Sequence, residues 1–212
     1  FDKYGVDPLR LYLMTSPLMK GEDANFDEKA VDRIYKSVCQ RTLNVLQFYN
    51  LYRDSSVEGT EFDPHSLENV LDKWAVALLH KFKTDVQTGM ENYDLVEATR
   101  PIEKFVDDFS TWYLRRSRER MKDGDKFAKV TMFHVLREFS KIIAPIMPFL
   151  SEIVWQELKN EQEEESIHLI SWPEGDNVPE ELEENHLLKE MEKAREIKKK
   201  ILFFFFLTRY LI

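Results

Sequence analysis

The strongest constraint on the fold of this chain is a series of long segments in which apolar residues recur every three or four positions. Between residues 28 and 52 these are Val31, Ile34, Val38, Val45, Phe48 and Tyr52, with one seven-residue gap. That spacing places them on one face of a helix. The same period returns at 72–91, 95–122, 126–144 and 148–158. The pattern predicts a chain built mainly from helices.

Turn and capping signals between these segments predict where the helices begin and end. Asp94 and Glu97 have the spacing of a capping box, in which side chains satisfy the free N–H groups of a first turn. Asp123-Gly124-Asp125 ends the third long helix, and Pro148 stands at a favourable first-turn position of the fifth. Pro101 lies inside a helix and removes one backbone donor, so a kink is expected there.

Composition favours the same fold class. The 212 residues include only 6 glycines and 8 prolines, few for a β-rich chain that needs many special turns. A hydrophobic content of 43% is ample for a packed core. Four long helices joined by short connections predict an all-α protein, an antiparallel helix bundle. The alternating stretch SIHLISWPE (166–174) predicts a short extended strap near the C-terminus.

The last twelve residues, ILFFFFLTRYLI (201–212), do not fit this pattern. Four consecutive phenylalanines have no amphipathic period and would expose a large apolar patch. Codons made of a single repeated base would encode both the preceding three lysines and the phenylalanine run. We therefore expect a truncated or frameshifted end, and a native anchor or partner-binding segment is the alternative.

The location expected from the sequence is the cytoplasm. The apolar run at 201–207 is shorter than the roughly 20 residues that span a bilayer, and the first residues do not have the pattern of a signal peptide. Cys39 is the single cysteine, so no internal disulfide forms and a reducing compartment fits. We expect no membrane partner.

Sequence motifs for catalysis and for metal binding are absent. The chain contains no G-x-G-x-x-G, no G-K-[ST] and no G-x-S-x-G motif, and its five histidines have no further histidine or cysteine at ligand spacing. Cys39, in the middle of a helix among apolar neighbours, is interpreted as a buried structural thiol. The acidic pairs Asp107-Asp108 and Glu180-Glu181 are interpreted as solvated surface, because adjacent helical residues point in different directions. We expect no catalytic residue, metal site or cofactor in this chain.

The charge distribution bears most directly on function. The formal net charge is -9, yet residues 115–122 contain five cations and one carboxylate, a local charge of +4, so the other residues carry -13. At 100° per residue, Arg115, Arg118 and Lys122 fall within about 60° of one another, well away from the apolar face. That face comprises Ile102, Phe105, Phe109, Trp112 and Tyr113.

Two interpretations of these cations remain open. Arg115, Arg118 and Lys122 form either a solvated face that complements the negative helix C-terminus or a phosphate-binding stripe anchored by the aromatic residues beneath it. Arg116 and Arg120 instead prolong the apolar face. We expect them to pair with acidic groups of neighbouring helices, because a half-buried guanidinium needs a partner.

Several segments, in this order along the chain, resemble the C-terminal half of class I isoleucyl-tRNA synthetases. They are FDKYGVDPLRLYLMTSP, GEDANFDEKAVDRIYK, LDKWAVALLHKF, ENYDLVEATRPIEKFVDDFSTWYLRRSR, APIMPFLSEIVWQEL and SIHLISWPE. The resemblance covers roughly residues 1–197. The valyl, leucyl and methionyl enzymes share the bundle, and the combination of WYLRRSRER with SIHLISWPE is most similar to the isoleucyl branch. Pro101 departs from the family, which usually continues an ordinary helix at that point.

The resemblance implies a division of the chain. Residues 1–27 would join the bundle to a catalytic domain that this sequence does not contain, and residues 28–160 would form the anticodon-binding bundle. Residues 161–200 would add the acidic loop, the strap and a C-terminal helix, followed by the anomalous apolar tail at 201–212.

It also implies a function. The bundle would hold the anticodon stem and loop of an isoleucine acceptor tRNA by backbone electrostatics and base stacking. Arg115, Arg118 and Lys122 would contact the tRNA, and Arg10 would face either the tRNA or the missing catalytic domain. The full enzyme esterifies isoleucine to its tRNA with ATP and Mg²⁺, and this chain alone is expected to be inactive. The alternatives are the same part of a valyl or related class I synthetase, and a non-catalytic helical interaction scaffold.

Overall fold

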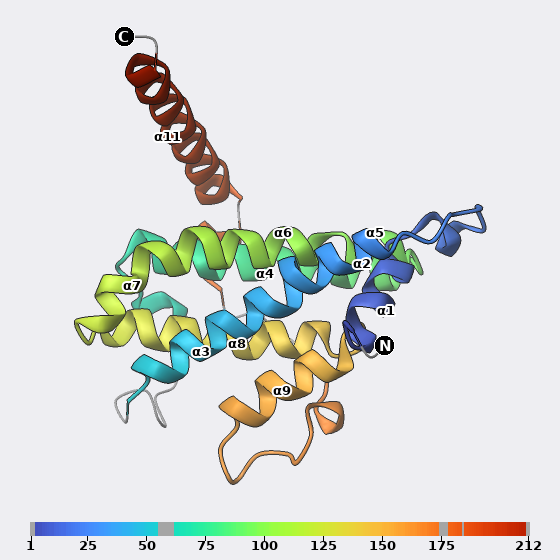
Figure 1. Cartoon of the computed structure of the whole chain (residues 1–212). Coiled ribbons are helices and arrows are strands. Elements are labelled where there is room, and N and C mark those ends of the chain that lie inside the picture. The colour runs from blue at the N-terminus through green and yellow to red at the C-terminus, as the bar shows by residue number, and fades with distance from the viewer. Residues whose placement is uncertain (1–2, 55–61, 174–177, 184, 211–212) are drawn as a thin grey trace.

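The computed structural model describes residues 3–54, 62–173, 178–183 and 185–210, with the backbone alone at 183 and 202–210. Helices dominate, and these residues contain no strand. Successive long helices run in opposite directions and pack into an antiparallel bundle, which confirms the predicted fold class (Figure 1). No helix in the described ranges is long and apolar enough to cross a membrane.

The helical elements follow one another with short connections. In chain order they are α1 (Val6–Met14), η1 (Pro17–Lys20), α2 (Glu28–Ile34), η2 (Tyr35–Gln40), α3 (Arg41–Tyr52), η3 (Pro64–Ser66), α4 (Val70–Glu91), α5 (Leu95–Thr99), α6 (Pro101–Asp108), η4 (Phe109–Leu114), α7 (Arg115–Lys122), α8 (Lys126–Ile143), α9 (Pro148–Leu158), η5 (Ile167–Leu169), α10 (Glu180–Glu183) and α11 (His186–Tyr210).

Two of the long helices each contain a π-helical turn. Helices α2 and α3 form one rod through η2, and α6 and α7 form another through η4. A π turn holds more residues than an α turn, so it shifts the phase of the side chains on either side of it. The seven-residue gap in the apolar spacing, from Val38 to Val45, begins inside η2. The irregular spacing in the sequence therefore coincides with an irregular turn.

The predicted cap at Asp94 is confirmed, and Asp27 caps α2 in the same way. The Asp27 carboxylate accepts the N–H of Lys29 at 2.9 Å, and that of Asp94 accepts the N–H of Glu97 at 3.0 Å. The predicted interruption at Pro101 is also present, since α5 ends at Thr99 and α6 begins at the proline.

Two details refine the sequence expectations. Helix α4 begins at Val70, two residues before the expected start, because the Asn69 side chain caps it by accepting the N–H of Leu71 at 2.9 Å. The expected strap contains the 3₁₀ turn η5, which is flanked by extended backbone at Ser166 and Ile170. There the carboxylate of Glu152 on α9 accepts the N–H of Ile167 at 3.1 Å and the hydroxyl of Ser166 at 2.9 Å. The segment is thus bonded to a helix and not to a sheet.

A ladder of aromatic rings forms the centre of the core. Phe105 stacks on Phe82 of α4, with ring centroids 4.5 Å apart, and on Phe139 of α8, at 5.0 Å. The ladder continues along the same rod from Phe105 to Phe109 at 5.9 Å and to Tyr113 at 5.2 Å. It therefore joins α4, α6 and α8 and leads directly to α7.

The N-terminal helix is joined to α9 by a buried carboxylate. Asp7 of α1 accepts the N–H of Leu150 at 2.7 Å, in the first turn of α9, whose own N-cap residue Met147 makes no side-chain cap. Burial raises the pKa of the Asp7 carboxyl. Burial also raises the pKa of the Cys39 thiol to about 12, and the charge of Asp7 adds to this. The cysteine is therefore an inert core residue, as the sequence predicts.

Helices α4 and α5 approach each other closely at Gly89 of α4, and this contact generates a test of the packing. A Cβ atom at this position would lie 2.4 Å from the backbone nitrogen of Ala98 on α5, nearer than real Cβ contacts occur. Gly89→Ala therefore forces α5 outward, and we expect the free energy of unfolding to fall by about 1–3 kcal/mol in urea denaturation. Thr88→Ala, on the exposed side of the same turn, is the control and should change the free energy of unfolding little. Equal unfolding midpoints for the two variants would show that the contact is not tight.

Candidate nucleic-acid interface

The aromatic ladder ends in a buried polar cluster that fixes α7 against α4. The Asp72 side chain is 0% exposed, and its Oδ1 atom accepts the Tyr113 hydroxyl at 2.8 Å. Arg120 donates to both Asp72 oxygens, at 3.0 and 2.7 Å, and to Asp125 at 2.8 Å. Burial lowers the pKa of Arg120, but its hydrogen bonds to the two carboxylates outweigh this and raise the pKa above its usual range. Arg120 thus has the internal acidic partner that its place on the apolar face indicates.

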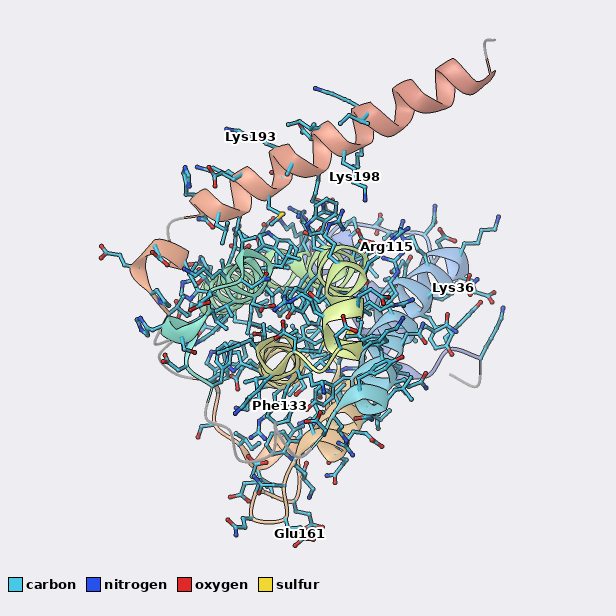
Figure 2. All side chains as sticks on the ribbon, turned by 90° about the vertical axis from the view of Figure 1, so that its left-hand side faces the viewer. Lys36, Arg115, Phe133, Glu161, Lys193 and Lys198 are labelled. Atoms are coloured by element: carbon cyan, nitrogen blue, oxygen red, sulfur yellow. The ribbon has the colours of Figure 1, made fainter. Side chains whose placement is uncertain are left out.

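Because Arg120 faces inward, the opposite side of α7 faces solvent. Arg115, Arg118 and Lys122 are all exposed there, and we call these three residues the α7 ridge. Figure 2 shows Arg115 at the surface of the bundle. In the described part of the chain, Arg115 and Arg118 form no ion pair, whereas Lys122 pairs with Glu119 at 2.9 Å, which raises the pKa of the lysine.

An aromatic pair from α3 lies beside the ridge. The guanidinium carbon of Arg118 is 5.3 Å from the centroid of the Phe48 ring, and Phe48 is 4.8 Å from Tyr52. Both rings are half-buried. This surface therefore combines unpaired cations with partly exposed aromatic rings, the two kinds of group that bind the backbone and the unstacked bases of RNA.

Arg116 and Trp112 do not have the environments expected from the sequence. Arg116 forms no ion pair with any described residue. Its guanidinium carbon instead lies 3.0 Å from the centroid of the Trp112 ring. Trp112 is half-buried at the edge of the core, where α11 covers it. The phase shift at η4 and the docking of α11 are the physical reasons for both differences.

The interpretation of Asp107 and Asp108 as a solvated pair is wrong for Asp108. Its side chain is buried, and it forms ion pairs with Lys104 of α6 and Arg195 of α11. Asp107 is partly exposed and pairs with Arg41. The Asp108 carboxylate thus holds α11 on the bundle.

Arg10 has an internal role in the structure. Its Nε donates to the carbonyl of Ile146 at 3.1 Å and its Nη2 to that of Pro145 at 3.2 Å, in the turn between α8 and α9. The side chain is half-buried and lies away from the α7 ridge. The structure therefore brings together three of the four predicted tRNA-binding residues and not Arg10.

The described residues contain no group of three or more histidine, cysteine or carboxylate side chains placed to hold a metal ion.

Comparison with known proteins identifies the family. A family model described as the anticodon-binding domain of tRNA ligase matches residues 72–202, which include α7 and most of α4 and α11. The chain belongs to the anticodon-binding domains of tRNA ligases.

Curated relatives of this anticodon-binding domain are isoleucine–tRNA ligases. The enzyme of Chlamydia trachomatis serovar L2 is 38% identical over 181 residues, which cover 81% of this chain and 17% of the relative. That of Chlamydia pneumoniae is 37% identical over 208 residues, or 92% of this chain and 19% of the relative. The chain therefore spans about a fifth or less of the length of these relatives.

A solved structure shares the fold. It is the ternary complex of the Agrobacterium radiobacter K84 agnB2 LeuRS with tRNA and LeuAMS. The TM-score is 0.59 at 18% identity, and the match covers 86% of this chain and 20% of the LeuRS chain. The arrangement of helices described above is thus that of a synthetase anticodon-binding domain.

Four residues around this interface are missed by the sequence reasoning. They are Phe48 and Tyr52, which look like ordinary members of an apolar face, and Arg195 and Lys198 of α11. The i, i+3 spacing of Arg195 and Lys198 was a usable signal, because it places both on one side of a helix. Nothing local in the sequence places that side against Trp112.

The buried Asp72–Arg120 pair leads to a stability prediction. Asp72→Asn leaves the Arg120 charge without its fully buried partner, and we expect the free energy of unfolding to fall by about 3–5 kcal/mol. Urea denaturation followed by circular dichroism measures this. Glu119→Gln removes the exposed partner of Lys122 instead and is expected to leave stability nearly unchanged. A stable Asp72→Asn variant would mean that the pair does not hold α7 in place.

Proposed function

We propose that this chain binds the anticodon stem and loop of an isoleucine acceptor tRNA as the anticodon-binding part of an isoleucine–tRNA ligase. The observation that carries the proposal is the α7 ridge. Its three cations face outward on an otherwise acidic protein of net charge -9, and two of them have no carboxylate partner among the described residues. Such an arrangement binds a polyanion at one place and repels it elsewhere.

The aromatic residues beside the ridge support RNA over other polyanions. Unpaired bases in loops are bound by stacking on aromatic rings and guanidinium planes. Phe48, Tyr52 and the Arg118 guanidinium provide such planes next to the phosphate-binding groups of the ridge. In this proposal the ridge positions the backbone of the anticodon arm, and the α3 surface receives bases of the loop.

The complete reaction needs groups outside this chain. Isoleucine activation with ATP and Mg²⁺ would take place in a catalytic domain, and the sequence has no glycine-rich phosphate loop to hold a nucleotide. The described residues also offer no metal-binding group, so no residue here is assigned to ATP or Mg²⁺. The free, buried thiol of Cys39 is compatible with the cytoplasm.

It follows that the chain alone should not aminoacylate tRNA. An assay with this chain, ATP, Mg²⁺, isoleucine and its tRNA is expected to yield no charged tRNA above the protein-free control. Charging that depends on the chain would contradict the division of roles proposed here.

Salt-dependent tRNA binding tests the ridge. If three phosphates are contacted, log K should fall with log[salt] at a slope of about -2 to -3, measured by fluorescence anisotropy with labelled tRNA. Arg118→Glu should weaken binding and make the slope shallower by about 1, because one phosphate contact is lost.

Arg100→Glu is the matched control. Arg100 is an exposed arginine at the other end of the same helical rod, between α5 and α6, and its reversal should leave binding nearly unchanged (Figure 1). A salt-independent interaction, or equal effects of the two reversals, would favour an interaction scaffold over tRNA binding. Stronger binding of a valine acceptor tRNA would instead assign the chain to the valyl branch.

A further inference from the structure

A second group of cations gathers around Trp112, between the bundle and α11. The Trp112 ring centroid lies 3.0 Å from the guanidinium carbon of Arg116, 5.2 Å from that of Arg195 and 5.4 Å from the Nζ atom of Lys198. Arg115 is near enough to affect the pKa values of both Arg116 and Lys198. We call Arg115, Arg116, Arg195 and Lys198 the Trp112 cluster.

The Trp112 cluster brings together residues far apart in the chain. Figure 2 shows α11 crossing above the bundle, with Lys198 on the side that faces Arg115. Lys193 lies earlier on α11 and is exposed. The cluster is therefore formed only while α11 is docked.

The positive charge of the cluster is only partly neutralised. Asp108 pairs with Arg195, and it also pairs with Lys104. In the described part of the chain, Arg115, Arg116 and Lys198 have no carboxylate partner. The nearby acidic residues of α11, Glu192 and Glu196, instead line the groove between α4, α6 and α11. Three unpaired cations thus face one another across two helices.

The pKa values reflect this repulsion. The charge of Arg116 is the largest cause of the lowered pKa of Lys198, followed by desolvation and the charge of Arg115. Desolvation is the largest cause of the lowered pKa of Arg116, followed by the charges of Arg115 and Arg195. An anion placed among these groups would remove the repulsion.

An unsatisfied donor lies at the same place. The indole Nε1 atom of Trp112 is buried and has no hydrogen-bond acceptor among the residues that the structure describes. A buried N–H group without an acceptor is uncommon and costs stability. A phosphate group offers several acceptor oxygens at once, so it suits a site in which two unpaired guanidinium groups and an ammonium group surround an indole ring.

We propose that the Trp112 cluster is a binding site for one phosphate group of the RNA backbone, and that its occupation fixes α11 on the bundle. The proposal rests on the proposed function, because Arg115 belongs to both the α7 ridge and the cluster. A backbone that follows the ridge reaches the cluster at this residue. The bound phosphate links Lys198 of α11 with Arg115 and Arg116 of α7 and removes their mutual repulsion.

The indole N–H signal of Trp112 provides a direct test. The chain has four tryptophans, so four indole signals are expected in a ¹⁵N correlation spectrum, and Trp112→Phe identifies the relevant one. Titration with an anticodon stem-loop RNA should shift that signal, and inorganic phosphate should shift it at higher concentration. Lys198→Gln should lower the affinity for inorganic phosphate at least fivefold. Lys193→Gln, an exposed change on the same helix, should leave it unaltered.

The outcomes separate this inference from the proposed function. If tRNA binds and depends on Arg118 while the Trp112 signal does not move, the phosphate site is refuted and the proposed function stands. If inorganic phosphate shifts the signal but RNA does not, the cluster is a site for free phosphate, and the assignment to the RNA backbone is refuted. Equal effects of Lys198→Gln and Lys193→Gln on the phosphate affinity would refute the role of Lys198 in binding the phosphate group. The site is supported if both ligands shift the Trp112 signal and Lys198→Gln lowers the affinity for inorganic phosphate.

Discussion

The ion pair between Asp72 and Arg120 is the interaction on which the functional surface depends. It takes one of five neighbouring cations into the protein, where Tyr113 and Asp125 complete the hydrogen bonding. Because α7 is rigid, the direction of Arg120 sets the directions of Arg115, Arg118 and Lys122. Burial of such a pair is weak evidence for added stability, but it specifies one orientation of the helix. The stripe of positive charge is therefore positioned by Asp72, whose side chain is fully buried.

Much of this arrangement follows from local sequence. Side chains next to each terminus determine the helix bounds at 126–143 and 148–158 and the caps at Asp27 and Asp94. The helical spacing determines the exposure of the three ridge residues. The environments of Trp112 and Asp108 did not follow, because they are set by Arg195 of α11, more than 80 residues away in sequence. The π turn at 109–114 adds a phase error that a uniform 100° rotation cannot reproduce. Rules based on local sequence thus fail to predict the surroundings of residues that pack against a helix distant in the sequence.

The distribution of charge suits a partner that must be held in one orientation. The net charge of the whole chain is negative, so most faces would repel a polyanion, whereas α7 and the facing side of α11 carry a local excess of positive charge. Arg115 stands where these two positive surfaces meet. The family relationship is consistent with this reading, because the match at residues 72–202 includes the residues of both surfaces.

The rod from α6 to α7 also limits where the length of this domain is able to change. A single-residue deletion within η4 is absorbed when the π turn becomes an ordinary α turn, because the residues after it then keep nearly the same orientation. A single-residue deletion after the turn, between residues 115 and 119, would instead rotate everything that follows by about 100°. The inward position of Arg120 would then be taken by a different side chain, and Asp72 would lose its partner although Arg120 itself was retained. Deletions in α7 should therefore be far more harmful than most replacements. The length of this helix, and not only its composition, therefore decides which side chain faces Asp72.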